Sequence, residues 1–278
     1  AGSYTDGYVG VAPGAELLVV KLKQSKQYLR DFFLIKDDVP AFEESDIMLA
    51  LRFLEDYAIR LGKPLIIIFG LGSANGSRTG ASPLAEMMEN LTKKPNISVI
   101  TCMGNEANNK CHYKGTVMSA LVPDVMEINV DGTGKGFTME IWADSLDILS
   151  VSIESPSGEY VPRIPARMGA SMEYTFLYEG STVTVDYQIT ENVAGMEVIF
   201  VRLKTPVEGT WKFYIYSLTN IKGSYNAWLP LKQFSGQDIY FLKSDPDTTL
   251  TVPAAADGVI SVGAYLSLIH ISEPTRRR

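Results

Sequence analysis

Cysteine and histidine are scarce in this chain of 278 residues. It contains two cysteines, Cys102 and Cys111, and two histidines, His112 and His270. Two cysteines are too few for a disulfide framework, and the spacing that zinc ligands need is missing. We expect Cys102, which lies in an apolar run, to be a small buried thiol, with a bond to Cys111 as the alternative.

An excess of basic charge and long apolar runs are also lacking. The chain carries 25 Lys and Arg against 32 Asp and Glu, a formal net charge of -7. Nucleic-acid binding needs a basic face that displaces counterions, so the charge argues against such a partner. No apolar run reaches the roughly 18 residues that span a bilayer. We therefore expect neither a nucleic-acid partner nor a membrane span.

Both ends of the chain look cut. The sequence begins without Met, and residues 266–278 read LSLIHISEPTRRR. Most of that stretch is what a transposase sequencing adapter encodes when it is translated. We expect residues 266–278 to be an artefact, which leaves His112 as the single native histidine, and a genuine strand with a tail is the alternative.

Apolar runs alternate with helical stripes in the N-terminal part. The runs at 17–22, 65–69 and 99–103 predict strands, and a helix from Ser45 or Asp46 should end at Gly62. Ser82 followed by Pro83 begins a second helix. Strands without alternation are typical of a parallel sheet that is buried on both faces. We therefore expect an α/β fold, with Gly70 and Asn105 at the carboxyl ends of two strands, where such sheets bind ligands.

From about Val117 the apolar pattern changes to a period of two. Segments such as FTMEIWA and WKFYIYSL alternate between apolar and polar residues, and turns separate them. A further apolar strand follows at 259–264. The pattern predicts an α/β domain over 1–116 and 246–265, interrupted by a β-sandwich or jelly roll over 117–245.

Four motifs occur in a fixed order: GVAPGAELLVVKL, PLIIIFG, VITCMGNE and TVPAAADGVISVGAY. Their order and wording resemble the subtilisin-like serine peptidases, the subtilases. The closest resemblance is to the clostridial subtilases of spore germination, which carry an inserted jelly roll. The resemblance implies a three-layer parallel sheet with helices on both faces, and a serine endopeptidase acting on protein or peptide substrates. It also implies a bacterial protein, secreted or spore-associated, that binds its own cleaved prodomain.

The resemblance assigns roles to residues at the strand ends. It implies that the side-chain amide of Asn105 stabilises the oxyanion of a tetrahedral intermediate. Gly104 would let the backbone pass close to substrate. The cleft would be lined by two extended segments and one wall of the specificity pocket, with these residues as candidates: Phe42, Phe69, Gly70, Leu71 and Met103. The alternatives are an Asn that caps a turn and side chains that belong to the sheet core.

The resemblance also bears on cofactors and on the catalytic triad. It implies no certain cofactor, but structural calcium near Asp245, Asp247 and Asn75 would fit the family. The catalytic Asp, His and Ser motifs have no match here, and His112 lies in an expected loop, so we predict that this chain alone is inactive.

Two other functions fit the sequence. The first is a non-catalytic subtilase that acts as a regulator or sensor, for example in spore germination. The second is a carbohydrate- or protein-binding β-domain, in which Trp142, Trp211 and Trp228 would stack on sugars. Core packing is the alternative explanation for these tryptophans.

Overall fold

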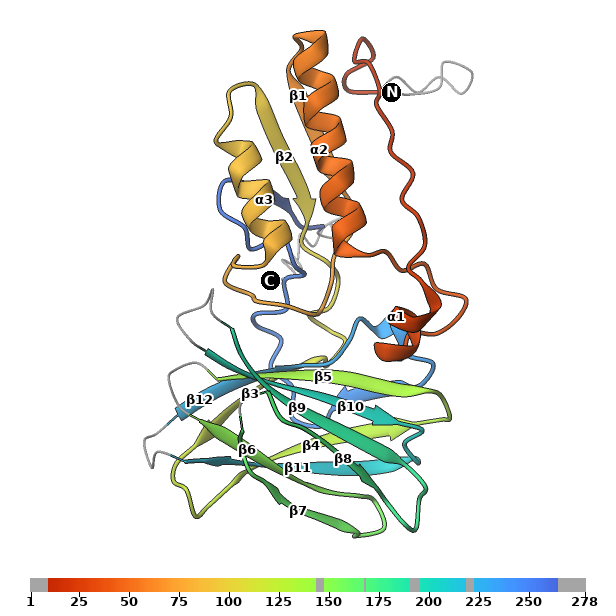
Figure 1. Ribbon diagram of the computed structural model, residues 1–278, viewed down its shortest axis with the longest axis vertical. Coiled ribbons are helices and arrows are strands. Elements are labelled where there is room, and N and C mark those ends of the chain that lie inside the picture. The colour runs from red at the N-terminus through yellow and green to blue at the C-terminus, as the bar shows by residue number, and fades with distance from the viewer. Residues whose placement is uncertain (1–9, 144–147, 168, 191–195, 219–222, 265–278) are drawn as a thin grey trace, which may run out of the picture.

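The computed structural model describes residues 10–143, 148–167, 169–190, 196–218 and 223–264. A small part with helices and a parallel sheet lies above a larger part made of two antiparallel sheets (Figure 1). The predicted adapter-derived stretch at 266–278, with His270, lies outside the described residues. Among the described helices, none is long and apolar enough to cross a membrane.

Three parallel strands form the sheet of the upper part. They are β1 (Leu65–Phe69), β2 (Ile97–Cys102) and β14 (Ile260–Val262), in the order β1-β2-β14. Phe69 pairs with Thr101, so β1 and β2 run in register and end at the same edge. Each strand falls on a predicted apolar run, at 65–69, 99–103 and 259–264, although β2 begins at Ile97, before its predicted run, and ends at Cys102.

The helices are α1 (Gln27–Phe32), α2 (Glu44–Leu61) and α3 (Pro83–Thr92). The end of α2 and the start of α3 follow the local signals that the sequence predicts, but α2 begins at Glu44 without a side-chain cap, so neither Ser45 nor Asp46 caps it. Gly62 follows α2 in the left-handed conformation at φ 61°, where glycine carries no steric penalty. The Ser82 hydroxyl accepts a hydrogen bond from the Ala85 amide at 3.1 Å and so caps the start of α3.

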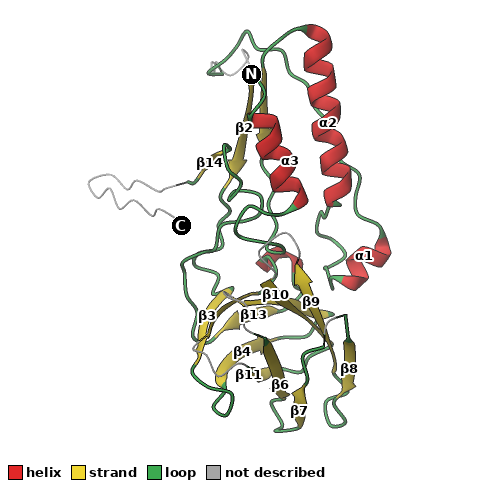
Figure 2. Cartoon of the chain, turned by 60° about the vertical axis from the view of Figure 1, so that its left-hand side comes forward, coloured by secondary structure: helices red, strands yellow, loops and turns green. Residues whose placement is uncertain are grey.

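The prediction of a three-layer α/β fold with helices on both faces is wrong. Most strands of the described chain lie in antiparallel sheets, and α2 and α3 cover the same face of the small parallel sheet (Figure 2). On the other face of β1, Ile66 and Ile68 are 65% and 79% exposed. The run at 17–22 forms no strand. An apolar run shows that a strand suits burial, but it does not show what covers each face.

Because only one face of β1 is buried, substitutions at two adjacent isoleucines should change the free energy of unfolding by different amounts. Ile67 is 4% exposed beneath the helices, so Ile67→Val should lower the free energy of unfolding by about 0.5–1.5 kcal/mol. Ile68 is 79% exposed, and Ile68→Val should change it by less than about 0.5 kcal/mol. Chemical denaturation of the two variants measures both values. Equal losses at the two positions would contradict the one-sided arrangement.

Two antiparallel sheets pack face to face in the lower part. Their strands are β3 (His112–Val117), β4 (Asp124–Asp131), β5 (Gly136–Ala143), β6 (Leu149–Glu154), β7 (Tyr160–Ile164), β8 (Ser171–Thr175), β9 (Thr182–Thr190), β10 (Met196–Lys204), β11 (Gly209–Ser217), β12 (Gly223–Trp228) and β13 (Asp238–Phe241). One sheet has the order β3-β12-β5-β10-β9-β8 and the other the order β13-β4-β11-β6-β7. A 3₁₀ turn, Lys232–Phe234, precedes β13.

The main hydrophobic core lies between these two sheets. Alternate residues of β11, such as Trp211 and Phe213, are fully buried there, as the period of two predicts. Trp228 and Trp142 pack together on the outer face of the six-stranded sheet and are 6% and 8% exposed. The burial of all three tryptophans favours packing over sugar stacking. Jelly-roll connectivity and the domain limits stay predictions.

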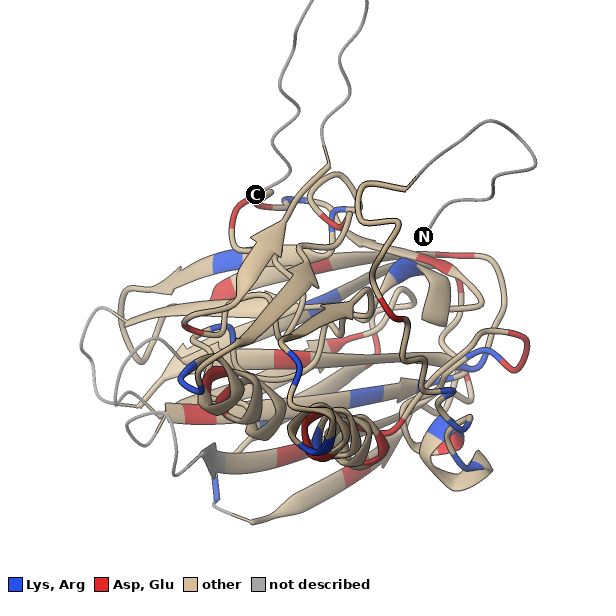
Figure 3. Ribbon diagram, turned by 90° about the horizontal axis from the view of Figure 1, so that it is seen from above, with Lys and Arg blue, Asp and Glu red and all other residues tan. Residues whose placement is uncertain are grey.

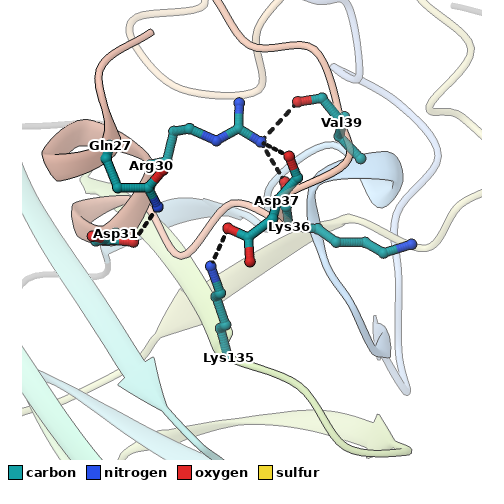
Figure 4. A network of polar contacts seen from close by, with 7 residues as sticks. All are labelled: Gln27, Arg30, Asp31, Lys36, Asp37, Val39 and Lys135. Carbon is teal, nitrogen blue, oxygen red and sulfur yellow. Dashed lines mark hydrogen bonds and ion pairs between the residues drawn. The ribbon is translucent and has the colours of Figure 1, made fainter.

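The α1 segment is attached to the six-stranded sheet. Phe32 stacks on Phe200 of β10 with ring centroids 5.8 Å apart. Arg30 donates hydrogen bonds to the carbonyls of residues 36, 37 and 39, which fixes the turn that follows α1 (Figure 4). Asp37 in that turn pairs with Lys135, and this bond lowers the pKa of the Asp37 carboxyl. The segment before α2 is therefore held against the sandwich.

Candidate functional site

A large cleft lies where the two parts of the chain meet. Its volume is about 1950 Å³. The carboxyl ends of β1 and β2, the loop after β1 and the α1 segment contribute residues to it, and so does the outer face of the six-stranded sheet. The β-sandwich thus forms one wall of the cleft.

The structure brings most of the predicted site residues to this cleft. Met103 is not among the lining residues, and its backbone instead joins β14 to the segment before Val252. Its amide donates to the Val262 carbonyl at 3.1 Å, and its carbonyl accepts from the Thr251 amide at 3.1 Å. The predicted residues that line the cleft are Phe42, Phe69, Gly70, Leu71, Gly104 and Asn105.

Asn105 follows β2 on a bend at the edge of the cleft, and its side chain is exposed. A turn-capping Asn would hydrogen-bond a nearby backbone group. In the part of the chain that the structure describes, no hydrogen bond engages the Asn105 carboxamide. The turn is closed by Asn109 instead, whose amide donates to the Glu106 carbonyl at 2.9 Å and whose side chain donates to the Glu106 carboxylate at 2.8 Å. The Asn105 amide is therefore left available to a ligand.

Thr251 lies between the ends of β1 and β2 and joins them. Its hydroxyl donates to the Cys102 carbonyl at 3.3 Å. Next to it, Val252 and Ser73 exchange backbone hydrogen bonds of 2.9 and 3.0 Å. A Cβ atom on Gly104, which has φ +82°, would lie 2.5 Å from the Thr251 Cγ2. Position 104 thus needs a glycine for two reasons besides the approach of substrate. A side chain would collide with Thr251, and the backbone there is left-handed.

Arg78 holds the loop after β1 together, and sequence reasoning did not single it out. Its guanidinium donates to the carbonyls of Ser73, Ala74 and Leu250. It also lies over the Trp228 ring, 5.1 Å from the centroid. Burial lowers the pKa of Arg78 to about 10, so it stays charged at neutral pH. The signal available in the sequence was a lone arginine in a Gly/Ser-rich loop.

Glu140 of β5 connects the same loop to the sandwich. Its Oε2 accepts hydrogen bonds from the Gly76 amide at 2.9 Å and from the Trp142 indole at 3.0 Å. Its side chain lines the cleft, and burial raises the pKa of its carboxyl. Nothing in the alternating pattern of β5 distinguishes this residue, because the pattern assigns Glu140 to a solvated face.

Comparisons with known proteins bear on the fold. No family model matches the chain, and no curated protein matches it. Among solved structures it is similar to the Clostridium perfringens CspB protease, with a TM-score of 0.72 and 24% identity. The alignment covers 84% of this chain and 49% of that one.

This chain shares the fold of that protease over the aligned region. At this level of identity the likeness shows the fold alone. It supports the subtilase-like fold that the motifs predict, without the three-layer arrangement. The chain also spans only about half the length of the protease, 49%, so the activity of the whole protein is a matter for proposal.

His112 lies in β3 and not in a loop as predicted. It is fully buried and stacks on Trp228 with ring centroids 4.9 Å apart. Its Nδ1 lies 3.1 Å from the Asp245 carbonyl and its Nε2 lies 3.0 Å from the Asn226 side-chain oxygen. Burial lowers the pKa of the imidazole. A buried ring engaged at both nitrogens has no position from which to act as a base in the cleft.

The cysteines form no disulfide. Cys102 and Cys111 are both free thiols, and Cys102 is half-buried rather than buried. Burial raises the pKa of the Cys111 thiol to about 11, so it is not a reactive thiolate at neutral pH.

The residues expected near calcium are partly engaged with each other. The Asp245 carboxylate accepts a hydrogen bond from the Asp247 amide at 2.9 Å. Within the described ranges, no three His, Cys, Asp or Glu side chains cluster so as to hold a metal ion. Calcium ligation there stays an expectation.

Proposed function

We propose that the cleft holds an extended peptide, and that this chain is part of a serine-type endopeptidase. In the full-length protein, Asn105 would donate its side-chain amide to the oxyanion, and triad residues from outside this chain would supply nucleophile and base. The observation that carries the proposal is the unpaired carboxamide of Asn105 at the cleft edge, where two parallel strands end. The fold likeness to a protease supports it.

The segments at the cleft suit a peptide backbone. β1 is an edge strand of its sheet, and Phe69, Gly70 and Leu71 continue it into the cleft. Phe42 enters the same cleft from the extended segment before α2. A peptide placed along an edge strand gains backbone hydrogen bonds, and pockets select its alternate side chains. An amide aimed at the bound carbonyl then stabilises charge that appears only during reaction.

Peptide binding is testable with this chain, because a matched pair of glycines is available. A Cβ on Gly70 or on Gly14 would meet nothing within 4 Å, and neither has a left-handed φ. Gly70→Val should weaken binding of mixed capped hexapeptides about tenfold by blocking one or two backbone hydrogen bonds. Gly14→Val should leave binding unchanged. Equilibrium dialysis measures both, and equal binding to the two variants would exclude this cleft as the peptide site.

A non-catalytic regulator that binds peptides in the same cleft is the second candidate. The histidine within the described residues, His112, is buried and engaged at both ring nitrogens, so a catalytic base would have to come from outside this chain. We expect this chain to bind peptides without cleaving them. Hydrolysis by the full-length protein decides between the two functions.

A further inference from the structure

The sandwich contributes a specific wall to the cleft. Glu140 and Trp142 of β5 and Val198 and Phe200 of β10 all line it. Phe200 is paired with Glu140, and Val198 with Trp142, so the four side chains share the outer face of the six-stranded sheet. Phe32 of α1 stacks on Phe200 and is 39% exposed in the same cleft. A single carboxylate thus lies among aromatic and aliphatic side chains.

One oxygen of that carboxylate has no partner in the described structure. Both hydrogen bonds to Glu140 end on Oε2, and none from a described residue ends on Oε1. Oε1 is also not among the fully buried atoms, so it is open to the cleft. No ion pair joins Glu140 to a basic side chain within the described ranges. The Arg78 guanidinium attracts the Glu140 carboxylate from a distance, but its Nη1 and Nη2 atoms donate to backbone carbonyls and its Nε is buried without a partner. Arg78 therefore compensates this carboxylate only in part, and a cation that reaches Oε1 from the cleft would form the ion pair that the described residues do not.

We propose that Glu140 receives a positively charged side chain, arginine or lysine, from a peptide bound in the cleft. The inference rests on the proposed peptide-binding function and adds the class of substrate. Oε1 would accept the hydrogen bond of the guanidinium or ammonium group. Val198 and Phe200 would cover its aliphatic stem. The Phe32 ring is already engaged, since Arg202 lies 4.4 Å from its centroid and Phe200 stacks on it. The hydrogen bonds to Gly76 and Trp142 keep the carboxylate in place for this contact.

The charge of the whole cleft agrees with a cationic ligand. The acidic side chains that line it are Glu43, Glu44, Glu106 and Glu140, against one basic side chain, Lys232. Elsewhere on the molecule, acidic and basic residues are interspersed along helices and strands (Figure 3). A peptide with a basic residue therefore meets an attractive field before it reaches Glu140.

Arginine and citrulline separate charge from shape, because the two side chains are nearly the same size. Capped hexapeptide pools would carry arginine at each position in turn, with mixed residues elsewhere, and matched pools would carry citrulline. We expect the wild-type chain to bind the best arginine pool about tenfold more tightly than its citrulline counterpart in equilibrium dialysis. Lysine and acetyl-lysine pools should show the same preference.

Glu140→Gln should abolish the preference, because glutamine keeps an acceptor for Gly76 and Trp142 but removes the charge. Glu86→Gln removes an exposed carboxylate of α3 that does not line the cleft, and should retain the preference. If the glutamine variant is destabilised, Glu140→Asp replaces it in the test. Aspartate keeps the charge on a shorter side chain, so this variant should prefer charged pools less strongly than the wild-type chain does. Equal binding of charged and neutral pools to the wild type would overturn this inference and leave the peptide cleft intact. Failure of both pools to bind would overturn both proposals.

Discussion

Replacing Asn105 with alanine in the full-length protein is expected to lower kcat for peptide hydrolysis by about 10²–10³ with little change in KM. The carbonyl oxygen of a bound peptide is nearly neutral, so it gains little from the Asn105 amide in the ground state. The tetrahedral intermediate carries a full negative charge there, and losing a fixed donor raises its free energy. Removal of the side-chain amide donor from a subtilisin causes a loss of this size. Steady-state kinetics on a peptide substrate measure it.

Asn109→Ala is the matched control for this experiment. Asn109 lies in the same loop, but its side chain donates to Glu106 rather than pointing into the cleft unpaired. We expect its removal to change kcat by less than about threefold, since a loop hydrogen bond contributes only about 1 kcal/mol to stability. If both alanine variants lose the same activity, the effect is a disturbed loop, and Asn105 has no special role. If the full-length protein hydrolyses no peptide, the result supports a non-catalytic regulator over an endopeptidase.

The parts of the fold that depend on neighbouring residues were predictable. The run LIIIF forms a strand, Gly62 ends a helix and Ser82 begins one, because turn chemistry and apolar pattern act over a few residues. The strand ends that carry Gly70 and Asn105 were placed at one edge by the same reasoning. The apolar run at 17–22 shows the limit, because it contains suitable residues but forms no strand in the described structure.

The parts that depend on distant residues were not predictable. Glu140 binds the Gly76 amide, 64 residues away in the sequence, and Arg78 binds the Leu250 carbonyl, 172 residues away. Their local partners, the Trp142 indole for Glu140 and the Ser73 and Ala74 carbonyls for Arg78, form no sequence motif that would mark either side chain. A sequence pattern shows only that Glu140 alternates with apolar neighbours, which suits a solvated sheet face. Its position in the cleft follows from how the sandwich packs against the loop after β1.

The same dependence on distant contacts makes Gly104 sensitive to a single added methyl group. Gly104→Ala is expected to lower the free energy of unfolding by about 2–5 kcal/mol. The left-handed backbone at φ +82° costs an alanine about 1–2 kcal/mol. The new Cβ would also lie 2.5 Å from the Thr251 Cγ2, and relieving such overpacking costs about 1–3 kcal/mol more. Denaturant titration of the variant measures the total.

Gly132 and Thr251 separate the two contributions. Gly132 has φ +80°, but a Cβ there would meet nothing within 4 Å, so Gly132→Ala should lose only the backbone term of about 1–2 kcal/mol. Thr251→Ser removes the clashing Cγ2 and keeps the hydroxyl that bonds Cys102, so it should restore part of the stability of Gly104→Ala. Gly72→Ala should not be rescued in this way, because its Cβ would lie 2.3 Å from the Thr251 Oγ1, which serine retains. Rescue at Gly104 without rescue at Gly72 would establish that Thr251 fixes the backbone on which Asn105 is held, whereas equal losses at Gly104 and Gly132 would show that it does not.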